Sequence, residues 1–452
     1  MTRWSATLLA TLALALTACG GRAATAGHPA TSTATAMPPV TRTATPRASA
    51  TTPALATATP FTPSGAYQPA PVKIVAPAGV RQLSGTLDGA EYVIQVPERW
   101  NGELAVYAHG YQGEGHELAI EAPPNAAQLL SEGFAWAASS YRTTGYVPGL
   151  GALDSRLLVG EFARRVGEPR RSYIIGQSMG GNSVALSLEQ PDTPFAGGLA
   201  LCGAVSGESE LDYLLSWLAL AQYFSGVTLP PHAGADLNAA LGRMTTALGT
   251  PSNPTAAGRR FIAALRDLTG GPRPFFLQGL EQQWAVSFGF ALLDPARQQP
   301  PIAASTNVGV SYSTGDPAAD APLNAAVPRF AADPALRDPR VHPDLAPTSG
   351  RLQRPLLTLH GTGDLFVPIS MEQEYLARVK AAGRQDLLVQ RAVRSAGHCS
   401  FSPQEIDRGW DDLVGWVQNG RRPAGEDLSH IDPATVGLPF TDPRRPADPG
   451  TE

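Results

Sequence analysis

The sequence predicts an α/β protein in which helices flank a mostly parallel central sheet. Short apolar runs typical of buried strands, such as Leu104 to Ala108, alternate with segments of helical spacing, such as Leu157 to Val166. Such alternation is typical of the strand–helix–strand units that build parallel sheets. Of the 452 residues, 43% are hydrophobic, which is enough for a large core and an inserted segment.

The elements can be placed in chain order from the same patterns. Eight strands are predicted from short apolar runs, at residues 72–75, 90–96, 104–108, 134–139, 171–175, 198–201, 355–359 and 387–393. Helices of the core are predicted at residues 157–166, 182–189 and 370–382, and a last one after Ser402. The segment Ser402-Pro403-Gln404-Glu405 combines a capping box with an early proline, which indicates a helix start.

Composition divides the chain into six segments. Residues 207–350 interrupt the alternating pattern between the sixth and seventh strands, and helical patterns at 211–224 and 237–248 predict a large, mainly helical cap there. The segments are a signal peptide (1–19), a disordered tether rich in Ala, Thr and Pro (20–71), the first part of the core (72–206), the cap (207–350), the second part of the core (351–420) and a tail rich in Pro and Asp (421–452).

The first residues resemble a bacterial lipoprotein export signal. Arg3 precedes an apolar stretch from Ala6 to Leu16, which is too short to span a membrane as a helix. The segment Leu16-Thr17-Ala18-Cys19-Gly20 resembles the lipobox, whose cysteine is lipidated and becomes the first mature residue. This resemblance implies an exported protein, at the cell surface or in the periplasm, that is anchored to the membrane through Cys19. An ordinary cleavable signal peptide is the alternative.

The segment Gly176-Gln177-Ser178-Met179-Gly180 connects a predicted strand to a predicted helix. A Gly-x-Ser-x-Gly sequence in that context is the pattern of a nucleophile elbow, which exposes the serine hydroxyl at the sheet edge. A serine needs a base to remove its proton, and the base needs an acid to orient it. Asp364 and His398 follow the last two predicted strands, in the order Ser, Asp, His expected for this elbow. Alternative acids follow the 198–201 strand: Glu208, Glu210 and Asp212.

These motifs, together with His109-Gly110-Tyr111 after the third strand, resemble the α/β-hydrolase superfamily over about residues 72–420. The resemblance implies that Ser178 is the nucleophile, His398 the general base and then acid, and Asp364 the orienting carboxylate. It also implies an oxyanion hole formed by the backbone N–H groups of Met179 and Tyr111. His109 is expected to brace its loop.

Cys202 and Cys399 both lie at predicted strand ends, and in an exported protein such a pair suggests a disulfide bond. We hypothesise a bond between them that pins the histidine loop to the sheet; two free thiols are the alternative. The pair His398-Cys399 is similar to tannases and feruloyl esterases, in which one cysteine follows the histidine and another precedes the serine. The sequence departs from that pattern because Gln177 precedes the serine.

Composition and motifs narrow the function. Acidic residues (39) exceed basic ones (34) and no basic run is present, which argues against nucleic-acid binding. The sequence has no tight metal-binding motif such as His-Glu-x-x-His, and no cofactor motif is predicted. Arg142, at the end of the fourth strand, is expected to pair with an acidic loop residue rather than with a substrate carboxylate.

The sequence therefore predicts a cofactor-independent hydrolase of carboxylic esters that works through an acyl-enzyme. Its expected partners are a small-molecule ester or peptide substrate, and the membrane through the lipid anchor alone. A serine peptidase of aminopeptidase type on the same fold is one alternative. A catalytically inactive binding lipoprotein is the other.

Overall fold

The computed structural model describes residues 68–70, 72–113, 115–229, 235–290, 304–340 and 342–446. These residues belong to the second of two units into which the chain divides, residues 49–452. The predicted signal peptide, the lipobox cysteine Cys19 and nearly all of the predicted tether lie outside the described residues. Among the helices that are described, none combines the length and the apolar character needed to cross a membrane.

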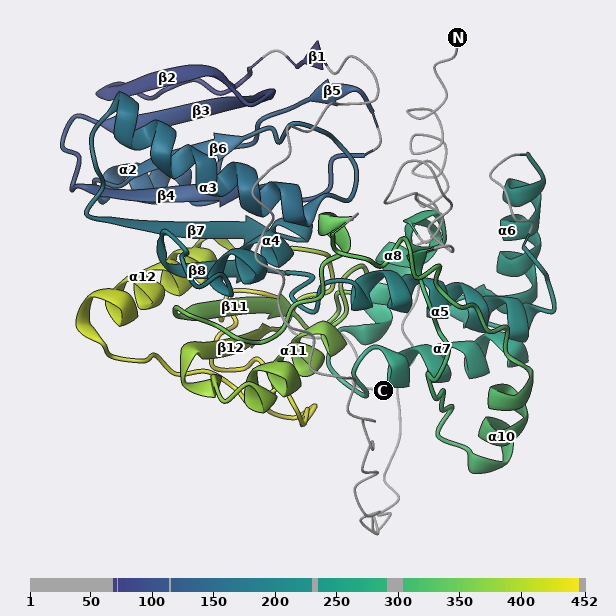
Figure 1. Ribbon diagram of the computed structural model, residues 1–452. Helices are drawn as coiled ribbons and strands as arrows, with labels where there is room; N and C mark the ends of the chain where they lie inside the picture. Colours follow the sequence, from purple (N-terminus) through teal and green to yellow (C-terminus); the bar gives the residue numbers. More distant parts are fainter. Residues whose placement is uncertain are drawn as a thin grey trace, which may run out of the picture. The chain divides into compact units, whose positions relative to one another are not determined.

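Eight strands form the central sheet, in the order β12-β11-β8-β7-β4-β6-β3-β2 (Figure 1). Strand β3 pairs antiparallel with β2 and β6, and all other neighbours are parallel. The bounds are β2 Val80–Leu87, β3 Ala90–Pro97, β4 Glu103–Ala108, β6 Ala135–Ser139, β7 Arg171–Gln177, β8 Phe195–Leu201, β11 Leu356–Gly361 and β12 Leu388–Val393. This mostly parallel sheet with a strand–serine–helix turn at its centre is the α/β-hydrolase fold, so the predicted fold class is confirmed.

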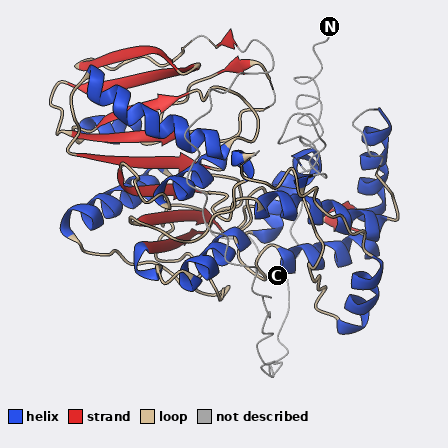
Figure 2. Ribbon diagram, viewed as in Figure 1, coloured by secondary structure: helices blue, strands red, loops and turns tan. Residues whose placement is uncertain are grey.

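Helices cover both faces of the sheet (Figure 2), and each face has its own apolar core. One core packs against α3 (Pro148–Arg165), α4 (Met179–Leu188) and α11 (Ser370–Ala381). The other packs against α2 (Ala126–Ser131) and α12 (Pro403–Asn419). Strands β4, β6, β11 and β12 are buried along their whole length, as expected for parallel strands covered on both sides. Because both faces of these strands are buried, the strands can be recognised in the sequence as apolar runs.

The start of the sheet is where the prediction was wrong. The expected strand Val72 to Val75 is irregular, and both valines are exposed, by 44% and 83%. The first strand of the sheet is β2, which sequence patterns missed because an edge strand has one neighbour and alternates half-buried with exposed residues. Upstream, residues assigned to the tether form β1 (Gln68–Pro69), which pairs in parallel with β5 (Glu117–Leu118).

The segment between β8 and β11, the sixth and seventh strands of the sheet in chain order, is mainly helical as expected. It contains α5 (Ser209–Ser225), α6 (Ala235–Leu248), α7 (Ala256–Leu268), α8 (Phe276–Phe290) and α10 (Pro317–Ala326), with a short hairpin of β9 (Gly249–Thr250) and β10 (Asn253–Pro254). Its aromatic residues mostly form a core of their own, which also takes in Leu365 and Val367 from the loop after β11. The insertion is therefore packed directly onto that loop.

The structure confirms the helix start predicted at Ser402 and describes part of the tail. Helix α12 begins with the expected capping box: the Ser402 hydroxyl accepts a hydrogen bond from the Glu405 N–H, and the Glu405 carboxylate accepts one from the Ser402 N–H. The described part of the tail, residues 421–446, packs against the sheet, with Leu428 and Val436 buried against Ala392 of β12.

Candidate active site

Ser178 lies in a sharp turn between β7 and α4, with φ +56° and ψ −122°. Few residues other than glycine adopt such a backbone, and the strain is accepted where it serves a function. A Cβ atom on Gly180 would lie 2.0 Å from the Ala108 carbonyl oxygen, and one on Gly176 would lie 2.2 Å from the Gly180 carbonyl oxygen. The two glycines of the motif are therefore required by close backbone packing, which lifts the serine hydroxyl above the sheet edge.

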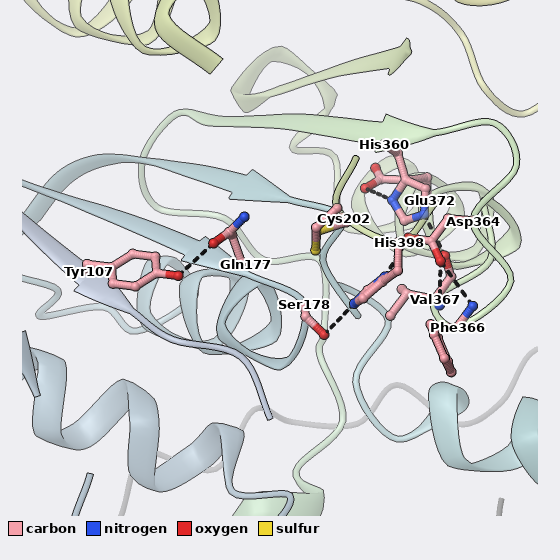
Figure 3. The surroundings of a disulfide bond; sticks show 11 residues. Tyr107, Gln177, Ser178, Cys202, His360, Asp364, Phe366, Val367, Glu372 and His398 are labelled. Atoms are coloured by element: carbon pink, nitrogen blue, oxygen red, sulfur yellow. Dashed lines mark hydrogen bonds and ion pairs between the residues drawn. A yellow bond between two sulfur atoms is a disulfide. The ribbon is translucent and has the colours of Figure 1, made fainter. Parts of the chain in front are cut away.

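Two hydrogen bonds connect Ser178, His398 and Asp364 (Figure 3). The Ser178 Oγ lies 2.9 Å from His398 Nε2, and His398 Nδ1 lies 2.6 Å from Asp364 Oδ2. With its proton on Nδ1, the imidazole donates to the carboxylate and accepts from the hydroxyl. Asp364 is fully buried, whereas the His398 side chain is 22% exposed. The structure thus brings together three residues that are far apart in the sequence.

The second oxygen of Asp364 is held by the backbone of its own turn. Its Oδ1 accepts hydrogen bonds from the N–H groups of Phe366 (3.0 Å) and Val367 (3.2 Å). His360 also contacts this turn: its Nε2 lies 2.7 Å from the Val367 carbonyl oxygen. Its Nδ1 lies 3.3 Å from a Glu372 carboxylate oxygen. These contacts fix the carboxylate plane that faces His398. His360 is itself a buried residue of β11, so it braces the turn from the strand and is not part of the turn.

The three alternative acids have other surroundings. Asp212 accepts a hydrogen bond from the Thr306 N–H and pairs with Arg337, and Glu208 lies 3.7 Å from Arg378. Glu210 is 5% exposed, and its Oε2 atom has no hydrogen-bond partner. Burial raises the pKa of the Glu210 carboxyl well above its usual value, and the nearby charge of Asp364 raises it further. The carboxylate in contact with His398 is that of Asp364.

The predicted oxyanion-hole residues lie next to Ser178. Met179 is the first residue of α4, where backbone N–H groups lack partners within the helix. A Cβ atom on Gly110 would lie 3.2 Å from the Ser178 Cβ, so the turn that contains Tyr111 rests against the serine. His109 is buried in that turn and stacks on the Tyr141 ring, with 3.8 Å between ring centroids. That contact suits the bracing role expected for His109.

A disulfide bond joins Cys202, directly after β8, to Cys399, the residue after His398. The two Cα atoms are 5.1 Å apart. The bond links the histidine loop, which follows β12, to the end of β8 on the other side of β11, rather than to a residue beside the serine as in the tannase pattern. Among the described residues, the one cluster of possible metal ligands is Cys202, His398 and Cys399. Bonded sulfur atoms are not thiolates, so this cluster does not fit a metal site.

The sequence predicts an acidic partner for Arg142 but gives no signal for Gln283. The Arg142 guanidinium pairs with Asp154, but this aspartate lies in α3 rather than in a loop. Gln283, in α8, hydrogen-bonds to both loops that carry Asp364 and His398. Its partners are backbone groups, which leave no pattern in the sequence.

Comparisons with models of protein families and with curated protein sequences find no match. Solved structures do resemble the chain. An esterase from Pyrococcus furiosus is 13% identical, over 76% of this chain and 92% of that one, with a TM-score of 0.38. An esterase from Aspergillus oryzae is 14% identical, over 76% and 80%, with a TM-score of 0.41. The acylaminoacyl peptidase of Pyrococcus horikoshii is 13% identical with a TM-score of 0.38; 77% of this chain spans 43% of that protein, less than half its length.

The disulfide can be tested by alkylation. Without reductant, the peptides that contain Cys202 and Cys399 should be recovered as a linked, unalkylated pair, because both sulfur atoms are bonded. After reduction in denaturant both should be alkylated, as the matched control. Replacing both cysteines by alanine should lower the free energy of unfolding by about 2–5 kcal/mol. Alkylation of both thiols in the unreduced, folded protein would contradict the bond.

The buried Glu210 carboxyl predicts a pH-dependent effect on stability. Because its pKa is raised in the folded state, ionisation opposes folding once the pH exceeds the pKa of an unfolded glutamate, about 4.3. Glu210→Gln does not ionise, so it should raise the urea midpoint of unfolding more at pH 8 than at pH 4. Glu117→Gln, at an exposed position, should show no such difference. An equal gain or a loss at both pH values would refute the prediction.

Proposed function

We propose that the protein is a serine hydrolase that cleaves carboxylic esters through an acyl-enzyme at Ser178. The observation that carries this proposal is the pair of hydrogen bonds, 2.9 Å and 2.6 Å, that joins Ser178 to His398 and His398 to Asp364. In this arrangement the imidazole can take the hydroxyl proton while Oγ attacks the ester carbonyl carbon. Asp364 keeps the imidazole in the required tautomer and stabilises the imidazolium that forms.

The later steps follow from the same groups. His398 Nε2 returns the proton to the leaving alcohol oxygen, and the acyl group stays on Ser178. Water then enters, His398 removes its proton, and attack on the acyl carbonyl releases the carboxylic acid and regenerates the serine. We assign the oxyanion hole to the backbone N–H groups of Met179 and Tyr111. The contact of the Gly110 turn with Ser178 supports that assignment.

We propose an ester substrate because the large helical insertion between β8 and β11 suits an esterase, but capped exopeptidases share the same scaffold. The aminopeptidase-like alternative would use the same three residues in the same roles. It differs only in the leaving group, an amine instead of an alcohol, so the test must compare the two substrate classes directly.

A fluorophosphonate probe tests the proposal because it reacts only with an activated serine. Peptide mass mapping should locate the label on Ser178. Labelling should be lost in Ser178→Ala and His398→Ala and should fall by about 10⁴-fold in Asp364→Asn, because the imidazole is then held in the wrong tautomer. Ser252→Ala, at an exposed position, is the control and should label at the native rate.

Each other outcome of this test has a defined meaning. Label on a different residue would refute the assignment of the nucleophile. A folded protein that does not react would favour the inactive binding lipoprotein. With a reactive Ser178, short-chain esters should be turned over and aminoacyl amides should not, whereas an activated serine of a peptidase would cleave both. Release of the amine from aminoacyl amides would replace the esterase by the peptidase.

A further inference from the structure

Helix α8 of the insertion packs directly against the two loops that carry Asp364 and His398. A Cβ atom on Gly279 would lie 1.7 Å from the Gly363 carbonyl oxygen and 2.8 Å from the Ala396 carbonyl oxygen. Gly363 immediately precedes Asp364, and Ala396 is two residues before His398. The helix backbone therefore touches both loops at one point, at a distance that only glycine allows.

Gln283 lies one turn further along α8, on the same side of the helix. Its side chain is buried, with an exposed fraction of 3%. The amide oxygen accepts hydrogen bonds from the N–H groups of Leu365 (2.9 Å) and Phe366 (2.8 Å). The amide nitrogen donates to the carbonyl oxygens of Gly363 (3.2 Å) and Ala396 (3.1 Å). One side chain thus bonds three backbone groups of the Asp364 loop and one of the His398 loop.

The bonds of Gln283 converge on the turn that orients the carboxylate. The Phe366 N–H is shared between the Gln283 oxygen and Asp364 Oδ1. The Phe366 ring packs edge-on against the His398 imidazole, with 5.5 Å between ring centroids, and Figure 3 shows the two side by side. A shift of this turn would therefore move both the carboxylate and a neighbour of the imidazole.

Two more residues of the insertion bond to the same loop. Arg273, between α7 and α8, donates from Nε to the Thr362 carbonyl oxygen at 2.6 Å. Tyr213, in α5, donates from its hydroxyl to the Leu365 carbonyl oxygen at 2.5 Å. The loop after β11 is thus bonded to α5, α8 and the connection before α8, besides its own strand.

We propose that Gln283 is a positioning residue that holds the Asp364 and His398 loops in fixed positions relative to each other. These bonds hold α8 against the two loops, so the helix does not move as a lid. The proposal rests on the proposed function, since the relative position of the two loops matters only if these residues react. An amide suits this place because it donates and accepts without adding charge beside Asp364. Moving α8 outward would break the bonds to both loops at once.

The rate of Ser178 labelling in the purified full chain measures the effect of Gln283. In Gln283→Ala, fluorophosphonate labelling should slow about 10- to 100-fold, because a misplaced base loses much of the advantage of correct orientation. Amide hydrogen exchange should become faster in peptides that cover residues 362–367 and 394–398. The matched control is Glu281→Ala in the same helix, an exposed residue whose carboxylate accepts from Ser252, and it should change neither readout.

Gln283→Glu separates positioning from general loss of packing and serves if the alanine variant does not fold. It keeps the shape and the two bonds from Leu365 and Phe366, but an ionised carboxylate cannot donate to Gly363 or Ala396. A protonated carboxyl can still donate one of these bonds. Its labelling rate relative to the native chain should therefore fall as the pH rises, which lost packing alone would not produce.

The outcomes distinguish this inference from the proposed function. If the native chain does not label at Ser178, both the proposed function and the positioning role of Gln283 are refuted. If the native chain labels and a folded Gln283 variant labels at the native rate at every pH, only the positioning role is overturned. Slower labelling with unchanged amide hydrogen exchange in both loops would also overturn the positioning role, because the two loops would then still be held in place.

Discussion

The short hydrogen bond between His398 Nδ1 and Asp364 Oδ2 is the interaction on which the rest of the site depends. The two residues belong to loops after adjacent parallel strands, β11 and β12, whose register brings the loop ends to the same sheet edge. The histidine loop is held by the disulfide at Cys399 and by Gln283 at Ala396, on either side of His398. The elbow then needs only to present Ser178 at the same edge, which the close packing of Gly176 and Gly180 ensures.

The parts of the site that could be predicted are those that follow from strand order. The carboxyl ends of parallel strands lie at the same edge of a sheet. Residues that directly follow the predicted strands are therefore expected to meet at that edge. Ser178, Asp364 and His398 meet in this way. Asp364 could not be separated from Glu208, Glu210 and Asp212 by pattern alone, because each follows a strand, and only the side-chain geometry distinguishes them.

Other features left no signal in the sequence. Edge strand β2 buries too little apolar surface to give an apolar run, and the sequence pattern instead favours residues 72–75, where both valines are exposed. Gln283 acts on backbone groups of loops about 80 and 113 residues away along the chain, and glutamine is common in helices. The insertion, expected as a cap from its position, turns out to contribute a buried polar contact to the loops of the candidate site.

The central claim is that Ser178 carries the acyl group during turnover, and intact mass after rapid acid quenching tests it most directly. A chromogenic ester mixed with the full chain should give a species heavier by one acyl group, mapped to Ser178. That species should be absent in Ser178→Ala, and it should decay at the rate of steady-state turnover if deacylation is slow. Ester turnover that persists in Ser178→Ala would contradict the account.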